Sequence, residues 1–179
     1  AAMQLGVRCH VLDKAGDVPA AAFTYRFTEG NPQDFDTVMR FAADLPAITI
    51  DSEHVSAQAL TALEAEGRIV APQGRVLEII QNKCRQKEFI ERCGFPTAKF
   101  QVASGRAELA KLSLDFPVVQ KTATSGYDGY GVKVLASAAD LEQAFDTESV
   151  IEEKIAIAKE IAVIVASDRT GNRVAYDAV

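Results

Sequence analysis

Short apolar runs alternate with amphipathic stretches along residues 1–73. The apolar runs have the length and composition of buried strands and lie at residues 7–12, 24–27, 47–50 and 68–70. Between these runs, residues 32–45 and 56–66 repeat apolar side chains at helical spacing, and Asn31 before Pro32 is typical of a helix start. Strands that alternate with helices at short intervals form a parallel sheet covered by helices. Residues 1–73 are therefore predicted to be an α/β domain.

The pattern after residue 73 predicts a mixed α+β arrangement. A helical pattern begins at Gly74 and ends at CysGlyPhePro, residues 93–96, because glycine and proline both stop helices. Further helices are expected after Ser104 and after Ser137. Strands are expected at residues 99–102, 117–121, 132–135, 150–153, 160–166 and 173–179, the last two joined as an antiparallel hairpin.

Residues 117–135, PVVQKTATSGYDGYGVKVL, combine two β-rich runs with a glycine-rich loop. Gly126, Gly129 and Gly131 allow the backbone to approach a ligand closely, so that successive N–H groups can point at anionic oxygens. Lys121, at the end of the first run, supplies a positive charge. We interpret this segment as a hairpin whose tip covers a phosphate chain, and the alternative is an ordinary β-hairpin.

Composition argues against several classes of protein. The chain has 179 residues, of which 48% are hydrophobic and 25% charged, enough for one substantial core or two small ones. A formal net charge of −6 argues against a broad surface for nucleic acid or an acidic membrane. The three cysteines form no CxxC pair, and the two histidines do not suggest a His-rich metal site or a serine-hydrolase triad.

The sequence also bears on location and on completeness. No apolar run approaches the roughly 18 residues needed to span a bilayer, and the N-terminus lacks a signal-peptide pattern, so we expect a cytoplasmic protein. The chain begins with AAMQLG, without an initiator Met, and ends on the apolar sequence RVAYDAV. We therefore expect it to be a segment of a longer protein.

Basic and acidic residues accompany the glycine loop in a characteristic order. Lys83 lies at the start of a predicted helix, Lys121 ends the strand before the loop, and Glu152 and Glu153 end a later strand. In this order the chain resembles the ATP-grasp superfamily. There, two basic side chains and a glycine loop hold the phosphates, and a strand-ending acidic pair meets the adenine and ribose.

The resemblance is closest to one family of that superfamily. Four sequences together are similar to the N5-carboxyaminoimidazole ribonucleotide synthase family: ITIDSEHV, IIQNKCRQKEFIERCGFPTAKF, VVQKTATSGYDGYGVKVL and VIEEKIAIAKEIAVIVA. The resemblance implies a fold that is α/β and then α+β. It implies a truncated, partial Rossmann-like domain at residues 1–73, connecting helices and a strand at 74–115, an ATP-grasp lid at 116–153 and the start of the ATP-grasp catalytic domain at 154–179.

The resemblance also implies an activity. Members of this family form carboxyphosphate from ATP and bicarbonate and then carboxylate the exocyclic amine of 5-aminoimidazole ribonucleotide in purine biosynthesis. It implies Mg²⁺ as a cofactor, with ligands outside this segment and none within it, and a homodimer. This segment alone is expected to be inactive, because phosphoryl transfer needs Mg²⁺ to bridge the phosphates.

Site residues follow from the resemblance residue by residue. The residues implied to contact ATP are Lys83, Lys121, Gly126, Tyr127, Asp128, Gly129, Tyr130, Gly131, Val132, Glu152, Glu153, Lys154, Ile155 and Glu160. The residues implied to approach the ribonucleotide are Asp51, Glu53, His54, Tyr127 and Asp128. Those implied to take part in catalysis are Lys121, Tyr127 and Asp128.

Each of these residues also has an ordinary structural interpretation. Lys83 can be a surface charge on a helix, Asp51 a helix cap, and Glu152 with Glu153 a solvated strand end. Tyr130 stands where the family usually carries Arg or Lys. The alternatives are another ATP-grasp carboxylase or ligase, or a catalytically silent nucleotide-binding module.

Overall fold

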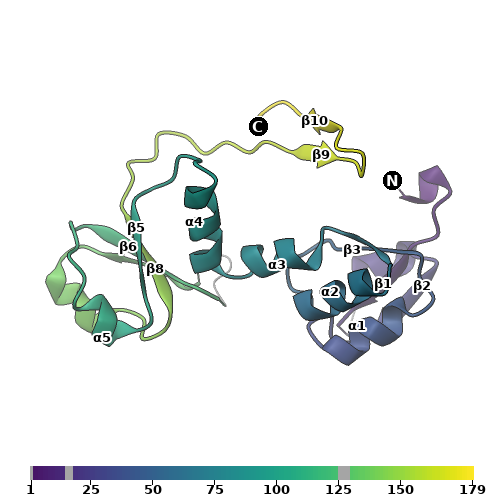
Figure 1. The fold of residues 1–179 in the computed structure, drawn as a ribbon, viewed down its shortest axis with the longest axis horizontal. Coiled ribbons are helices and arrows are strands. Elements are labelled where there is room, and N and C mark those ends of the chain that lie inside the picture. Colours follow the sequence, from purple (N-terminus) through teal and green to yellow (C-terminus); the bar gives the residue numbers. More distant parts are fainter. Residues whose placement is uncertain (1, 15–17, 125–129) are drawn as a thin grey trace.

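The computed structural model describes residues 2–14, 18–124 and 130–179 and has two lobes and an extended C-terminal arm (Figure 1). Helices α3 (Gly74–Ile80) and α4 (Lys83–Arg92) follow one another between the two lobes. No helix in these ranges is long and apolar enough to cross a membrane.

The first lobe is α/β, as predicted. Strand β1 (His10–Asp13) pairs in parallel with β2 (Arg26–Glu29), and β3 (Ala47–Thr49) pairs in parallel with β4 (Ile69–Ala71). Helices α1 (Phe35–Ala42) and α2 (Ala57–Ala65) pack on one another and bury Val38, Leu60 and Leu63. The short 3-10 helices of this lobe are η1 (Ala2–Leu5) and η2 (Pro19–Phe23).

Helix α1 begins later than predicted. Asn31 and Pro32 do not start it; the Asn31 side chain instead accepts a hydrogen bond from the backbone N–H of Gln33 at 3.1 Å. Asp34 is the N-cap, and its carboxylate accepts from the N–H of Thr37 at 2.9 Å and from the Thr37 hydroxyl at 2.5 Å. An ionised Asp at the N-cap satisfies an unpaired helix donor and faces the positive end of the helix dipole, which explains the later start.

The helical region predicted from Gly74 to residue 93 is two helices. Helix α3 ends at Ile80, and the side chain of Asn82 caps α4 by accepting from the N–H groups of Cys84, at 2.9 Å, and Arg85, at 3.1 Å. A capping side chain competes with the continuous helix for the same backbone donors. The break redirects the chain from the first lobe to the second.

The second lobe is a four-stranded antiparallel sheet in the order β5-β8-β6-β7. Its strands are β5 (Phe100–Ala103), β6 (Val118–Thr122), β7 (Val132–Leu135) and β8 (Ser149–Glu153), and its short helices are α5 (Arg106–Leu109) and η3 (Ala138–Gln143). The predicted hairpin of residues 117–121 and 132–135 is confirmed as β6 and β7.

The two faces of this sheet pack against different helices. On one face, Leu109 of α5 packs with Leu135 and Ile151 in a buried cluster. On the other face, Cys84 of α4 packs with Ala123 and Val150. Because side chains alternate along a strand, Lys121 and Glu152 lie on the face that α4 covers.

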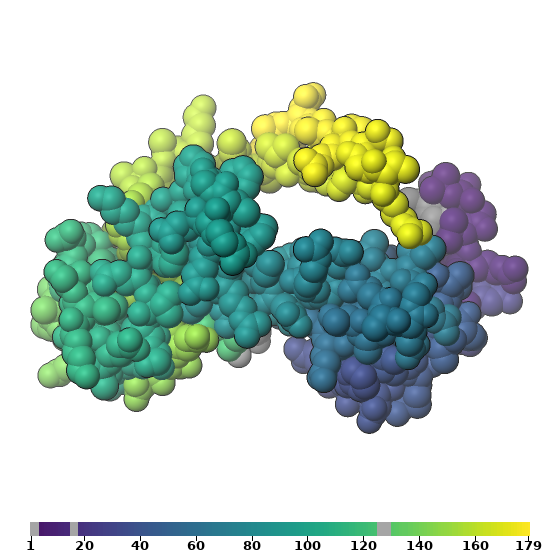
Figure 2. All heavy atoms as spheres, viewed as in Figure 1, coloured from purple at the N-terminus to yellow at the C-terminus, as the bar shows by residue number. Residues whose placement is uncertain are grey.

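Residues 154–179 form an exposed arm. Strands β9 (Val165–Ser167) and β10 (Arg173–Ala175) pair as the predicted antiparallel hairpin, and Asp168 accepts hydrogen bonds across its turn from Thr170 and Asn172. Figure 2 shows open space between this yellow segment and the body of the molecule.

Candidate functional site

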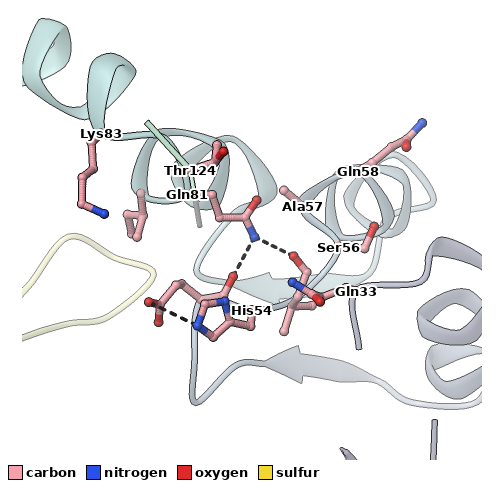
Figure 3. A pocket seen from close by; sticks show the side chains of 11 residues that line it. Gln33, His54, Ser56, Ala57, Gln58, Gln81, Lys83 and Thr124 are labelled. Carbon is pink, nitrogen blue, oxygen red and sulfur yellow. Dashed lines mark hydrogen bonds and ion pairs between the residues drawn. The ribbon is translucent and has the colours of Figure 1, made fainter. Parts of the chain in front are cut away.

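A pocket of about 550 Å³ lies where the first lobe, the α3–α4 junction and the end of the strand before the glycine loop come together. Its wall includes Gln33, Glu53, His54, Val55, Ser56, Ala57, Gln58, Ile80, Gln81, Lys83 and Thr124 (Figure 3). Three residues predicted for ligand binding, Glu53, His54 and Lys83, therefore share one pocket. Asp51 precedes this loop, is exposed, and is not part of the pocket wall.

The loop that carries Glu53 and His54 is held by Gln81. The side-chain amide of Gln81 donates to the backbone carbonyl of Glu53 at 2.6 Å and to that of Val55 at 2.7 Å. The Glu53 carboxylate lies 3.8 Å from His54 Nε2, and both side chains are about half exposed (Figure 3). The loop thus offers a carboxylate and an imidazole to the pocket from a backbone attached to α3.

Lys83 reaches the pocket from the first turn of α4. Its backbone N–H donates to the carbonyl of Ala123 at 2.8 Å, which ties the start of α4 to the end of the segment that precedes the glycine loop. Thr124, one residue further along, completes the pocket wall. A lysine ammonium and a hydroxyl both favour an anionic group here.

A second cluster of charges lies on the sheet face that α4 covers. Glu152, whose side chain is 7% exposed, accepts from Lys121 Nζ at 2.6 Å through Oε2 and lies 2.9 Å from Lys87 Nζ through Oε1. Burial raises the pKa of Glu152, but the hydrogen bonds and charges of Lys121 and Lys87 lower it by more than burial raises it. The pKa of Glu152 therefore lies below the ordinary value of 4.5. Glu152 is therefore ionised at neutral pH, and the cluster carries a net charge of +1.

Helix α4 connects the pocket and this cluster. Lys83 and Lys87 are four residues apart, and such positions lie one above the other on the same side of a helix. Cys84, on the buried side of α4, anchors the helix to Val150 of β8. Burial, together with the charges of Glu148 and Glu88, raises the pKa of the Cys84 thiol to about 11. This thiol is neutral and serves as packing.

The hairpin places the described residues of the glycine loop at the edge of the lobe. Gly131 has φ 77°, a conformation that favours glycine, and its carbonyl accepts from the N–H of Thr122 at 2.9 Å. Tyr130 is 72% exposed, and Val132 pairs across the hairpin with Lys121. Gly126, Tyr127, Asp128 and Gly129, all predicted site residues, lie outside the described residues.

The remaining predicted residues lie at the end of β8 and along the arm. Glu153 is exposed, and its carboxylate accepts from the backbone N–H of Lys99 at 3.0 Å. Lys154, Ile155 and Glu160 are exposed. Their proposed contacts with adenine and ribose stay predictions.

The sequence reading missed Lys87, Gln81 and Thr124. Lys87 had one available signal, its spacing of four residues from Lys83 on a predicted helix. Gln81 and Thr124 had none, because their roles depend on which segments meet in space. Within the described residues, no group of three or more His, Cys, Asp or Glu side chains could hold a metal ion.

Comparisons with known proteins agree with this architecture. Residues 1–81 match the ribonucleotide synthetase preATP-grasp domain model, and residues 88–179 match the ATP-grasp domain model. The N5-carboxyaminoimidazole ribonucleotide synthase of Synechococcus elongatus is 35% identical over 177 aligned residues, which cover 96% of this chain and 45% of the relative.

Solved structures extend the similarity to the fold. The N5-carboxyaminoimidazole ribonucleotide synthetase of Thermotoga maritima has a TM-score of 0.88 at 30% identity. The match covers 99% of this chain and 48% of the Thermotoga maritima chain. The Aspergillus clavatus N5-carboxyaminoimidazole synthase, in complex with ADP and 5-aminoimidazole ribonucleotide, has a TM-score of 0.85 at 26% identity, with the same coverage of 99% and 48%.

This chain spans less than half the length of the relatives it matches. The ATP-grasp model nevertheless covers more than half of the chain, and the preATP-grasp model covers most of the rest. The predicted fold class is thereby confirmed. The chain belongs to the ATP-grasp family, and its relatives there include the N5-carboxyaminoimidazole ribonucleotide synthases that its sequence resembles.

Proposed function

We propose that the protein containing this chain carboxylates 5-aminoimidazole ribonucleotide to N5-carboxyaminoimidazole ribonucleotide. In this reaction a bicarbonate oxygen attacks the γ-phosphorus of ATP, which forms carboxyphosphate and releases ADP. The exocyclic amine of the ribonucleotide then attacks the carbon of carboxyphosphate, and phosphate leaves. The proposal places the protein among the ATP-dependent carbon–nitrogen ligases of purine biosynthesis.

The observation that carries the proposal is the pocket between the lobes. Glu53 and His54 enter it from the preATP-grasp side, while Lys83 and Thr124 enter it from the elements next to the glycine loop. The amine of the ribonucleotide must reach the carboxyphosphate that forms at the ATP phosphates, so the sites for the two substrates must adjoin. A wall with a carboxylate and an imidazole on one side and a lysine and a hydroxyl on the other suits such an arrangement.

Lys83 and Lys121 are proposed to contact the phosphates of ATP. Lysine side chains neutralise the charge that spreads over a transferring phosphoryl group, and this electrostatic stabilisation dominates phosphoryl-transfer catalysis. Lys121 is about one-third exposed, which leaves its ammonium able to turn from Glu152 towards a bound nucleotide. Glu152, Glu153, Lys154 and Ile155 are proposed to contribute the adenine contacts, and Glu160 the ribose contacts.

Glu53 and His54 are proposed to approach the ribonucleotide, with Asp51, Tyr127 and Asp128 as further contacts. The carboxylate of Glu53 can accept from an amine or a ribose hydroxyl, and His54 can donate to a phosphate. Mg²⁺ would neutralise the charge of the ATP phosphates, with ligands proposed to come from outside this segment. A homodimer is proposed on resemblance.

The test measures ADP and phosphate release by the full-length protein with ATP, bicarbonate and 5-aminoimidazole ribonucleotide. Phosphate release should require all three substrates, and Glu53→Gln should raise KM for the ribonucleotide with little change in KM for ATP. Glu66→Gln, at the exposed C-terminal end of α2, is the matched control and should leave both constants unchanged. ADP formation that does not depend on the ribonucleotide would contradict the proposed acceptor and favour another ATP-grasp ligase.

A further inference from the structure

We propose that Lys87 is a positioning residue for nucleotide binding, which acts by keeping Glu152 ionised and in place when Lys121 turns to the nucleotide phosphates. This inference rests on the proposed ATP-binding function and deepens it. It assigns a role to a lysine that the sequence motifs did not include.

The geometry of Lys87 is that of a fixed internal cation. Its side chain is 16% exposed, and its ammonium lies 2.9 Å from Glu152 Oε1 and 2.5 Å from the Thr97 hydroxyl. The same ammonium lies 5.9 Å from the centre of the Phe100 ring. Partners from three segments, namely the loop after α4, β5 and β8, therefore hold one charge in one position.

Lys121 is held less firmly than Lys87. Its side chain is 34% exposed, about twice as much as that of Lys87, and the partner recorded for it in the described part of the chain is Glu152 Oε2. Glu152 Oε1 thus pairs with the less exposed lysine, Lys87, and Oε2 pairs with the more exposed lysine, Lys121. This asymmetry identifies Lys121 as the cation free to move and Lys87 as the one that stays.

The charge balance explains why two lysines are present. The charged groups that face Glu152 in the described residues are Lys87 from α4 and Lys121 from β6, and β5 presents the uncharged Phe100. If Lys121 were the sole partner, its movement to a phosphate would leave a buried carboxylate unpaired. An unpaired buried carboxylate is costly and takes up a proton. Lys87 prevents this, because the Lys87–Glu152 pair remains neutral after Lys121 leaves.

This mechanism predicts a proton linkage in a variant without Lys87. In Lys87→Met, nucleotide binding should remove the last cation from Glu152, raise the pKa of this carboxylate and cause proton uptake. Linkage then requires that nucleotide affinity rises as the pH falls. The unaltered protein should show little proton uptake on the same step.

The experiment measures ADP binding to the full-length protein by titration calorimetry in buffers of different ionisation enthalpy, from about pH 8 to about pH 6. Lys87→Met should weaken ADP binding at the higher pH by about tenfold or more, with uptake of up to about one proton per ADP. Lys87→Arg, which keeps the charge, should restore most of the affinity and abolish the uptake. Lys111→Met, the same substitution at an exposed site of this lobe, is the control and should bind ADP like the unaltered protein.

A double-variant comparison separates this role from simple folding support. In a Glu152→Gln background there is no buried carboxylate to stabilise, so adding Lys87→Met should not weaken ADP binding further. The inference would be overturned if Lys87→Met weakened ADP binding equally in the unaltered and the Glu152→Gln backgrounds. It would also be overturned if Lys87→Met alone left the ADP affinity unchanged and caused no proton uptake. If the unaltered protein fails to bind ADP, the proposed function fails first, and the inference fails with it.

Discussion

Glu152 is the buried carboxylate of the charge cluster in the second lobe. Its side chain is 7% exposed, and its two oxygens bind two different lysines. Removing one partner of such a group usually destabilises a protein strongly, whereas the intact group adds little net stability. Net stability alone therefore does not explain why two lysines share this carboxylate.

The ionisation of Glu152 makes the free energy of unfolding depend on pH in the acidic range. Its folded-state pKa lies below the ordinary value of 4.5, so the stability it contributes is present above that value and is lost as the pH falls through the folded-state pKa. We expect the free energy of unfolding, measured with urea from about pH 7 down to about pH 3, to decline less steeply below about pH 4.5 in Glu152→Gln than in the unaltered protein. Parallel declines in the two proteins would contradict this expectation.

At the scale of elements, the close approach of α2 and α3 depends on Gly74. A Cβ at this position would lie 2.7 Å from both the Ala57 carbonyl oxygen and the Thr61 nitrogen, which are backbone atoms of α2. The Gly74 N–H also donates to the Glu64 carboxylate at 3.0 Å. Glycine is therefore required here by packing and not by its dihedral angles.

Gly74→Ala should force the two helices apart. The expected loss is about 1–3 kcal/mol in the free energy of unfolding, as for other overpacked sites. Arg75→Ala, at the exposed next position, is the control and should change the free energy by no more than about 0.5 kcal/mol. Urea unfolding monitored by circular dichroism compares the two, and equal effects would show that the α2–α3 contact tolerates the added methyl group.

Gln81 links α3 to the loop that carries Glu53 and His54. In Gln81→Glu, a carboxylate oxygen would replace the amide nitrogen and face two carbonyl oxygens, so both hydrogen bonds should turn into repulsion. We expect faster backbone hydrogen exchange across residues 51–58, measured by mass spectrometry, and a loss of about 1–3 kcal/mol in the free energy of unfolding.

Gln58→Glu provides the matched control for this change. Gln58 lines the same pocket from α2 and points away from the loop (Figure 3). Gln58→Glu therefore adds the same negative charge to the pocket without facing the carbonyl oxygens of Glu53 and Val55. If both variants raise exchange in the loop equally, charge in the pocket and not the Gln81 hydrogen bonds would be responsible.

At the scale of the whole molecule, the arm differs from the two lobes. Residues 154–179 are exposed, and several of them are large and apolar, including Ile157, Ile161, Ile164 and Tyr176. The space-filling view shows open space beneath the middle of this segment (Figure 2). The arm therefore has few contacts that would protect it.

Limited trypsin digestion of the 179-residue chain should cut the arm first. Lys154 and Lys159 lie in exposed, irregular backbone, and Arg169 lies in the turn of the hairpin. Exposed segments without packing are cleaved from the native state, whereas packed strands require unfolding. Mass spectrometry should find the products ending at these residues before products cut at Lys83 or Arg106. The reverse order would mean that the arm is protected in solution.

Much of the architecture could be predicted from local sequence. The helix predicted at residues 56–66 is α2, which Ser56 caps by accepting from the N–H of Ala59 at 3.2 Å. The strands of the hairpin and β8 also agree, because β-rich runs next to turn residues have few alternatives. The predicted start of α1 at Asn31 and Pro32 was wrong, because Asp34 offers a better cap three residues later.

The candidate site could be predicted only in part. Glu53, His54 and Lys83 were selected by resemblance, and the pocket brings them together. Lys87 was not among the predicted site residues, because nothing near it in sequence indicates that Glu152 lies opposite. Sixty-five positions separate the two residues, and the contact exists because α4 packs on β8.

The sequence by itself determined the order of elements, the glycine hairpin and the family, since these depend on local patterning and on motifs that stay together along the chain. Tertiary structure alone decided that Glu152 binds two lysines and that Gln81 holds the Glu53 loop. The physical reason is that both arrangements depend on sheet register and on how α3 and α4 leave their junction at Asn82. Such contacts join segments whose separation in sequence carries no information about their distance in space.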